Sequence, residues 1–219
     1  MAEISKRIEL AAMSARTRAH AAGDGLLMLS GPNLNLLGER EPETYGTTTL
    51  AEIEASVATA AAAAGLHLVD AVQSNHEGEL IDRLHVRDFS WLIINPGGLT
   101  HTSISLRDAL LAVERPFAEV HLSDPATREP FRSVNFVEDL AAVTVRGYGA
   151  TGYLRAVALI AELRNASRVA GSLRCTSAKG RSTARSASRR LTLVWVSPLG
   201  LMISHEKSRT WSRSISSPS

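Results

Sequence analysis

Cysteine, lysine and long apolar runs are scarce in this chain of 219 residues. The single cysteine, Cys175, excludes an intramolecular disulfide and a cysteine-based metal site. Lysine occurs only at Lys6, Lys179 and Lys207, so the middle of the chain lacks the desolvated lysine that a Schiff-base mechanism needs. No apolar run approaches the ~20 residues of a membrane span, and the N-terminal region lacks the apolar stretch of a signal peptide. We therefore expect a cytoplasmic protein without a membrane span.

Common binding motifs are also missing. The chain contains neither a GxGxxG motif nor a P-loop, and its histidines do not fall at metal-ligand spacing. These absences argue against dinucleotide, P-loop and histidine–metal chemistry. The hydrophobic content of 44% is nevertheless sufficient for one sizeable core.

Charge is divided unevenly along the chain. Residues 1–165 carry 14 Lys and Arg against 21 Asp and Glu, whereas residues 166–219 carry 10 against 1. We predict a flexible extension over residues 1–24, a domain over 25–165 and a disordered Ser/Arg-rich tail over 166–219, because the tail has too little apolar surface to order itself. A basic tail can bind nucleic acid, but no aromatic pattern accompanies this charge. We favour a solvated tail, or sequence read from a shifted frame.

Strand and helix patterns alternate between Leu26 and Leu163. Expected strands cover Leu26–Ser30, Leu66–Gln73, Trp91–Asn95, Phe117–Ser123 and Ala141–Val145, and expected helices run from Thr49 to Gly65, Ser74 to Arg87, Ser103 to Glu114 and Gly152 to Leu163. The pairs Thr49/Glu52 and Ser74/Glu77 have the spacing of capping boxes. Five strands alternating with helices predict an α/β fold, a parallel sheet with helices on both faces. We prefer the flavodoxin-like strand order 2-1-3-4-5.

The loop after the first strand, GPNLNLLGEREPETYG over residues 31–46, is the most informative segment. It contains Asn33, Arg40 and Tyr45. A tyrosine is a poor base at neutral pH unless its pKa of about 10 is lowered, and a nearby arginine has that effect. An incidental surface tyrosine is the alternative reading of this pair.

A second candidate lies at the end of the fourth strand. Glu119 and His121 are two apart, so both side chains point to the same face of a strand. A carboxylate in that position can hold the imidazole in one orientation and stabilise its charged form, as in a catalytic triad. A structural, hydrogen-bonded histidine is the alternative.

Three further clusters are weaker. Asn95 begins a Gly-rich turn that leads through His101 into the next helix, where backbone can approach an anion. Arg128 and Arg132 are four apart, so they could share a helix face and bind a carboxylate or phosphate, although such a pair more often belongs to a solvated turn. Residues 74–78 combine polar side chains that capping already explains.

Four segments, taken together and in order, resemble a type II 3-dehydroquinate dehydratase: GPNLNLLGEREPETYG, QSNHEGELIDRLH, NPGGLTHTSISLRDAL and EVHLSDPATREPFR. The resemblance covers about Leu26 to Leu163 and neither terminal region. It implies a flavodoxin-like fold, a homo-oligomer that is a dodecamer built from four trimers, and no cofactor or metal. It also implies dehydration of 3-dehydroquinate to 3-dehydroshikimate in aromatic amino-acid biosynthesis.

The same resemblance assigns roles to individual residues. It implies that Tyr45 is the base, that Arg40 stabilises the anionic species, that His121 is the proton donor and that Asn33 holds a water against the developing enolate. Substrate-binding positions are implied at Asn95, His101, Asp108, Leu122, Ser123 and Arg132. Of these, Leu122 and Ser123 act through backbone amides on the carboxylate, and Asp108 reaches a neighbouring subunit's site. Elimination of water from a β-hydroxy ketone needs a base, an enolate stabiliser and an acid, and these residues can supply all three.

The sequence departs from the family pattern at two places in the domain and in the extension over residues 166–219, which is foreign to the family. Asp124 stands where the family usually has Asn, and the stretch Ser133–Phe136 replaces a His-containing run. Two alternatives remain: the same reaction in quinate catabolism, and a non-catalytic flavodoxin-like module with a nucleic-acid-binding tail.

Overall fold

A single parallel sheet forms the centre of the computed structural model, which describes residues 23–39 and 46–178, with side chains up to residue 169. The strands are β1 (Gly25–Ser30), β2 (His67–Gln73), β3 (Trp91–Asn95), β4 (Phe117–His121) and β5 (Val143–Arg146). Their order is β2-β1-β3-β4-β5, and all four pairings are parallel. The predicted topology is confirmed.

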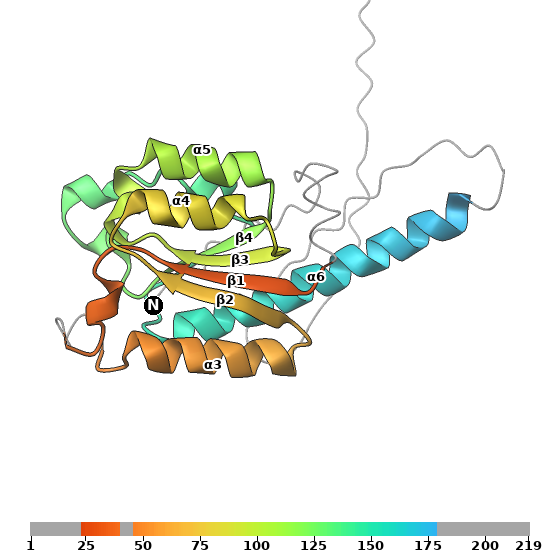
Figure 1. Cartoon of the computed structure of the whole chain (residues 1–219), viewed down its shortest axis with the longest axis horizontal. Coiled ribbons are helices and arrows are strands. Elements are labelled where there is room, and N and C mark those ends of the chain that lie inside the picture. Colours follow the sequence, from red (N-terminus) through yellow and green to blue (C-terminus); the bar gives the residue numbers. More distant parts are fainter. Residues whose placement is uncertain (1–22, 40–45, 179–219) are drawn as a thin grey trace, which may run out of the picture. The chain divides into compact units, whose positions relative to one another are not determined.

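Two layers of helices cover the sheet (Figure 1). Helices α4 (Glu77–His85) and α5 (Ile104–Val113) lie on one face, and α3 (Leu50–Ala63) and α6 (Thr151–Ala178) lie on the other. Short 3-10 turns connect the elements at η1 (Leu34–Leu36), η2 (Gly97–His101), η3 (Pro125–Thr127), η4 (Pro130–Ser133) and η5 (Glu138–Leu140). Within residues 23–39 and 46–178, no helix is both long and apolar enough to cross a membrane.

The central strands are buried on both faces, which explains their unbroken apolar sequences. In β1, Leu26 and Met28 pack with α3 and α6, whereas Leu27 and Leu29 pack with α4 and α5. Strands β3 and β4 are also entirely buried. This burial holds the C-terminal ends of β1, β3 and β4 in fixed positions side by side.

One predicted capping box is confirmed and the other is wrong. Thr49 and Glu52 form both reciprocal bonds at the start of α3, and Gly65, at φ +71°, follows its C-terminal end. At α4, by contrast, the N-cap is His76 and no side chain caps the helix. The Ser74 hydroxyl donates instead to Glu79 at 2.5 Å, and Glu77 accepts a bond from Ser103, the N-cap residue of α5.

Helix α6 continues beyond its predicted end at Leu163 to Ala178. The residues after Leu163 include Arg164 and Arg168, one helical turn apart, and both guanidinium groups bind Asp24 just before β1, at 3.0 and 2.5 Å. The prediction that the disordered tail begins at residue 166 is wrong, since residues 166–178 are helical. Ala, Leu and Arg favour a helix even where Ser is frequent. The predictions for residues 1–22 and 179–219 lie outside the described part of the chain.

Candidate active site

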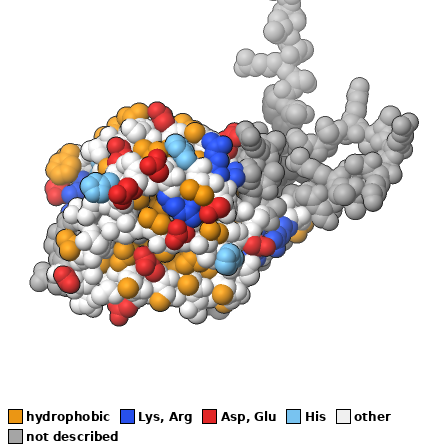
Figure 2. Space-filling model, viewed as in Figure 1, with side chains coloured by type: hydrophobic (Ala, Val, Ile, Leu, Met, Phe, Trp, Pro, Cys, Tyr) orange, Lys and Arg blue, Asp and Glu red, His pale blue; other side chains and the backbone are white. Residues whose placement is uncertain are grey.

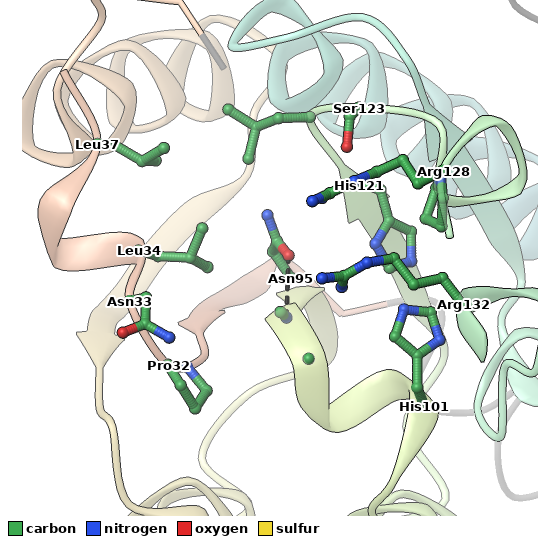
Figure 3. Close-up of a pocket in the computed structure, with 14 residues that line it drawn as sticks. Pro32, Asn33, Leu34, Leu37, Asn95, His101, His121, Ser123, Arg128 and Arg132 are labelled. Carbon is green, nitrogen blue, oxygen red and sulfur yellow. Dashed lines mark hydrogen bonds between the residues drawn. The ribbon is translucent and has the colours of Figure 1, made fainter. Parts of the chain in front are cut away.

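A pocket lies at the C-terminal ends of β1, β3 and β4, the edge of an open parallel sheet where ligands usually bind. Figure 3 shows residues of the β1 loop on one side and Arg128 and Arg132 reaching in from the other, with Asn95 between them. The lining residues are Pro32, Asn33, Leu34, Leu37, Asn95, Gly97, Gly98, His101, His121, Leu122, Ser123, Pro125, Arg128 and Arg132. Seven of the predicted site residues thus border one cavity.

The remaining predicted residues fall elsewhere. Glu119 lies behind His121, bonded to it and completely buried. Asp108 is exposed on α5 and is not among the residues that line the pocket. Arg40 and Tyr45 lie outside the described residues.

Glu119 and His121 form a hydrogen-bonded pair at the end of β4. His121 Nε2 lies 2.9 Å from Glu119 Oε1, and His121 is only 6% exposed. Because Nε2 is engaged by the carboxylate, Nδ1 is the ring nitrogen that can exchange a proton with a bound molecule. The predicted strand geometry of the pair is confirmed.

Glu119 is charged although it is buried. Burial by itself raises the pKa of the Glu119 carboxyl, but the hydrogen bond and charge of His121, followed by hydrogen bonds from Thr100 and Asn135, outweigh it and lower the pKa. Thr100 Oγ donates to Glu119 Oε1 at 2.7 Å, and Asn135 Nδ2 lies 3.0 Å from each carboxylate oxygen. A buried carboxylate with this many donors is stable as an anion and can orient an imidazole.

Asn95 is fixed in orientation by two neighbours. Its Nδ2 donates to the hydroxyl of Tyr153 at 3.0 Å, and its Oδ1 accepts the Gly97 N–H at 3.1 Å. Tyr153 is completely buried, which raises the pKa of its phenol to about 12. Tyr153 therefore stays neutral and serves to hold the Asn95 amide.

The turn after β1 brings Asn33 to the pocket. Gly31 is required there, because a Cβ at this position would lie 2.3 Å from the carbonyl oxygen of Pro96. Asn33 follows with φ +67°, a left-handed conformation that Asn tolerates better than most residues, and its N–H donates to Asn75 Oδ1 at 2.9 Å. The β1 and β3 loops are thus packed tightly against each other.

Two arginines give the pocket a cationic side. Arg132 Nε lies 2.7 Å from Glu129 Oε2, and Arg128 Nε lies 3.5 Å from the same oxygen. Both guanidinium groups lie beside the Glu129 carboxylate and border the pocket, where guanidinium groups can bind an anionic ligand. The sequence suggested that the two side chains could share a helix face, but they do not, because Arg128 follows η3 and Arg132 lies in η4.

His101 is oriented by the chain that follows η4. Its Nδ1 lies 2.5 Å from the carbonyl oxygen of Val134. A neutral His101 therefore carries its proton on Nδ1 and presents Nε2 as an acceptor to a hydroxyl group.

The departure at Asp124 is conservative in structure. Its carboxylate accepts the Ala126 N–H at 3.1 Å and caps η3, a bond that an asparagine oxygen would also accept. The turn that brings Arg128 to the pocket is therefore compatible with either residue.

Comparisons with known proteins identify the family. The sequence model described as Dehydroquinase class II matches residues 24–161. The chain belongs to the class II dehydroquinase family. Similar family members include the 3-dehydroquinate dehydratase of Xanthomonas campestris pv. campestris (strain 8004), 54% identical over 142 residues, which cover 63% of this chain and 95% of that protein. Another, from Halorhodospira halophila, is 54% identical over 131 residues, 58% of this chain and 88% of that protein.

Solved structures of class II dehydroquinases share the fold. The type II dehydroquinase from Propionibacterium acnes is 34% identical, with a TM-score of 0.60 over 64% of this chain and 97% of that chain. The type II dehydroquinase from Butyrivibrio crossotus is 33% identical, also with a TM-score of 0.60, over 62% of this chain and 96% of that chain.

Four residues at or behind the pocket were not among the predicted site residues of this dehydroquinase. Arg128 has one sequence signal, its four-residue spacing from Arg132, but such a pair more often belongs to a solvated turn. Thr100, Asn135 and Tyr153 act behind the lining residues, where they bond to Glu119 or Asn95. No local sequence pattern indicates such contacts, since they join residues 16 to 58 positions apart.

Proposed function

We propose that this chain eliminates water from 3-dehydroquinate to give 3-dehydroshikimate. The observation that carries the proposal is the buried Glu119–His121 pair at the edge of a pocket with two arginines, in a member of the class II dehydroquinase family. The substrate is an anionic polyhydroxylated ketone, which suits a pocket of arginines, amides and imidazoles. No lysine occurs between residues 7 and 178, so the reaction proceeds through an enolate without a Schiff base.

His121 is the proposed acid. As an imidazolium it donates a proton to the departing hydroxide, while Glu119 balances its charge and fixes its ring. The bond between His121 Nε2 and Glu119 Oε1 supports this division of roles.

Tyr45 is the proposed base, and Arg40 the cation that favours its phenolate. Both are assigned from the loop sequence and lie outside the described residues. Tyr153 does not compete for the role of base, because its raised pKa makes that phenol too weak an acid to form a phenolate at neutral pH. Asn33 is the proposed residue that holds a water against the developing enolate.

Substrate recognition is proposed for the rest of the lining. Arg132 and the backbone amides of Leu122 and Ser123 would bind the carboxylate side, whereas Asn95 and His101 would bind hydroxyl groups. The fixed orientations of the Asn95 amide and the His101 ring support specific rather than loose hydroxyl contacts.

Assembly as a dodecamer, a tetramer of trimers, is also part of the proposal. Asp108 would then complete a neighbouring copy's site, since it lies on an exposed side of α5 together with Ile104 and Leu111, which are 51% and 50% exposed. Sedimentation of the full chain tests this directly. A monomer with full turnover would contradict it.

We place the reaction in aromatic amino-acid biosynthesis rather than quinate breakdown. Rescue of growth without aromatic amino acids in a strain lacking its own dehydratase tests this assignment. Nucleic acid is not a proposed partner, and on the face in Figure 2 the Arg side chains of the described residues lie among Asp and Glu.

The deciding experiment is a turnover assay. The purified full chain is mixed with 3-dehydroquinate, and the ultraviolet absorbance of the conjugated enone product is followed. An absorbance that stays constant with folded, purified protein would overturn the proposal. RNA binding that persists at moderate salt would favour a binding module.

A further inference from the structure

The stretch Ser133–Phe136, which departs from the family pattern, contacts the Glu119–His121 pair through Asn135. Its backbone is held on both sides: the Phe136 N–H donates to Thr100 O at 2.9 Å, and Val137 is completely buried in the core beside α4 and α5. Val134 O accepts the bond from His101. This stretch is therefore an ordered part of the site.

The amide of Asn135 has a defined orientation. Its Oδ1 lies 2.8 Å from Val137 N, 3.0 Å from Glu138 N and 2.9 Å from the Thr100 hydroxyl. Two backbone N–H groups can only donate, so this atom is the oxygen and the opposite atom is the nitrogen. Nδ2 therefore faces Glu119, 3.0 Å from each carboxylate oxygen.

The carboxylate is in this way held by three side chains. His121 and Thr100 bind Oε1, and Asn135 reaches both oxygens. Without Asn135, Oε2 loses this donor in a fully buried position, which disfavours the charged carboxylate and frees its rotation.

We propose that Asn135 is a positioning residue for the dehydration: its amide keeps Glu119 ionised and in the plane that orients His121. This inference rests on the proposed function. Asn135 does not line the pocket, so it acts through Glu119 and not on the substrate.

Asn135→Asp is the sharpest test. The new carboxylate can still accept from the Val137 and Glu138 N–H groups, so the turn is kept, but it faces Glu119 with a second negative charge. Two adjacent carboxylates cannot both ionise readily, so one retains a proton at higher pH. We expect kcat at neutral pH to fall about 10-fold or more, KM to change little, and the acidic limb of the kcat–pH profile to move to higher pH.

Asn135→Ser serves as the second variant, since its hydroxyl can accept the Val137 N–H but is too short to replace the amide. We expect a smaller kcat loss and a smaller shift of the same limb. Ser133→Asp is the matched control, because it adds the same charge at an exposed position of the same stretch. The ion pairs Arg107–Asp139 and Arg146–Glu138 flank the stretch and are present in all variants.

The outcomes separate the two proposals. Folded Asn135 variants with wild-type kcat and pH profile, or with a raised KM alone, overturn the positioning role. If the wild-type chain has no turnover, the proposed function fails, and carbon NMR of the Glu119 carboxyl still tests the contact. A titration midpoint that rises in Asn135→Ser supports it, and an unchanged midpoint overturns it.

Discussion

At the scale of single residues, hydrogen bonds decide which buried group is charged. Tyr153 and Glu119 are both completely buried. Burial raises the pKa of the Tyr153 phenol to about 12, so this side chain is a neutral support for Asn95. Burial also opposes ionisation of Glu119, but its donors outweigh it and lower the pKa. The site therefore combines a fixed anion with a fixed neutral phenol.

The base can be tested by a change of one atom. We expect Tyr45→Phe to lower kcat by ~100-fold or more with folding intact, because only the proton acceptor is removed. Tyr148→Phe is the matched control and should retain turnover, since Tyr148 lies against Arg155 and is not among the residues that line the pocket. Turnover of Tyr45→Phe near the wild-type rate would exclude Tyr45 as base.

The acid can be tested by a double-mutant cycle. Glu119→Gln should lower kcat with little effect on KM, because an amide can still bond to His121 but stabilises imidazolium poorly. His121→Ala should cost more, and the combined loss should be smaller than the product of the two, as for residues that act together. His85→Ala, exposed on α4, is the control. Fully multiplicative losses would direct the search for the donor to His101.

Acid stability tests the charge of Glu119. A carboxyl with a lowered pKa stabilises the fold at pH values above the ordinary glutamate pKa of 4.5, and this contribution is lost as the pH falls through the folded-state pKa. We therefore expect the free energy of unfolding to fall more steeply below about pH 4.5 in the wild type than in Glu119→Gln. Urea unfolding across this range measures the difference.

Glu54→Gln gives a comparison of opposite sign. Burial raises the pKa of Glu54, so this group contributes more stability when protonated and loses that contribution as the pH rises. For each variant, the difference in free energy of unfolding from the wild type is plotted against pH. If the two plots had the same shape, Glu119 would not be held as an anion.

At the scale of elements, helix ends are set by a few side chains. Thr49 accepts the Glu52 N–H at 3.3 Å, while Glu52 accepts the Thr49 N–H at 2.8 Å. At the other end of α3, Arg164 donates to Ala64 O at 2.8 Å and also to Gly65 O. Sequence spacing predicted the first arrangement, whereas the second joins residues about 100 positions apart.

The cap of α3 can be measured by chemical denaturation. We expect Thr49→Ala to lower the free energy of unfolding by about 1 kcal/mol, because two backbone N–H bonds at the helix start depend on the box. Thr59→Ala is the matched control in the same helix. Its hydroxyl only returns to Ala55 O, so alanine should be neutral or slightly stabilising. Equal losses in both would mean that the box contributes nothing.

At the scale of the whole molecule, the boundary of the folded unit lies beyond Asn165. Ser167 is 8% exposed, and Arg168 binds Asp24. We expect truncation after Asn165 to lower the free energy of unfolding by about 1–2 kcal/mol, because the last turns of α6 lose bonding partners. Truncation after Ala178 should preserve stability and turnover, since the Xanthomonas relative is matched over 95% of its length by 142 residues. Equal stability of the two truncations would show that residues 166–178 contribute nothing.

The sequence by itself determined the sheet and part of the site. Alternating apolar strands and amphipathic helices predicted a parallel sheet with helices on both faces, because buried parallel strands and their covering helices have distinct local patterns. The order β2-β1-β3-β4-β5 was the preferred flavodoxin-like topology, and the structure confirms it. The two-residue spacing of Glu119 and His121 predicted a shared face, since strand periodicity is local. Motifs over Leu26 to Leu163 predicted the family.

Only the tertiary structure decided which residues act behind the pocket. Ser74 and Glu77 have capping-box spacing, but Ser74 bonds to Glu79, five positions on, and Glu77 bonds to Ser103, 26 positions away. The end of α6 depends on Asp24, far away in sequence. Asn135 and Tyr153 join the site through contacts across 16 and 58 positions. Such contacts have no sequence period, because they form where the packed sheet brings distant side chains together.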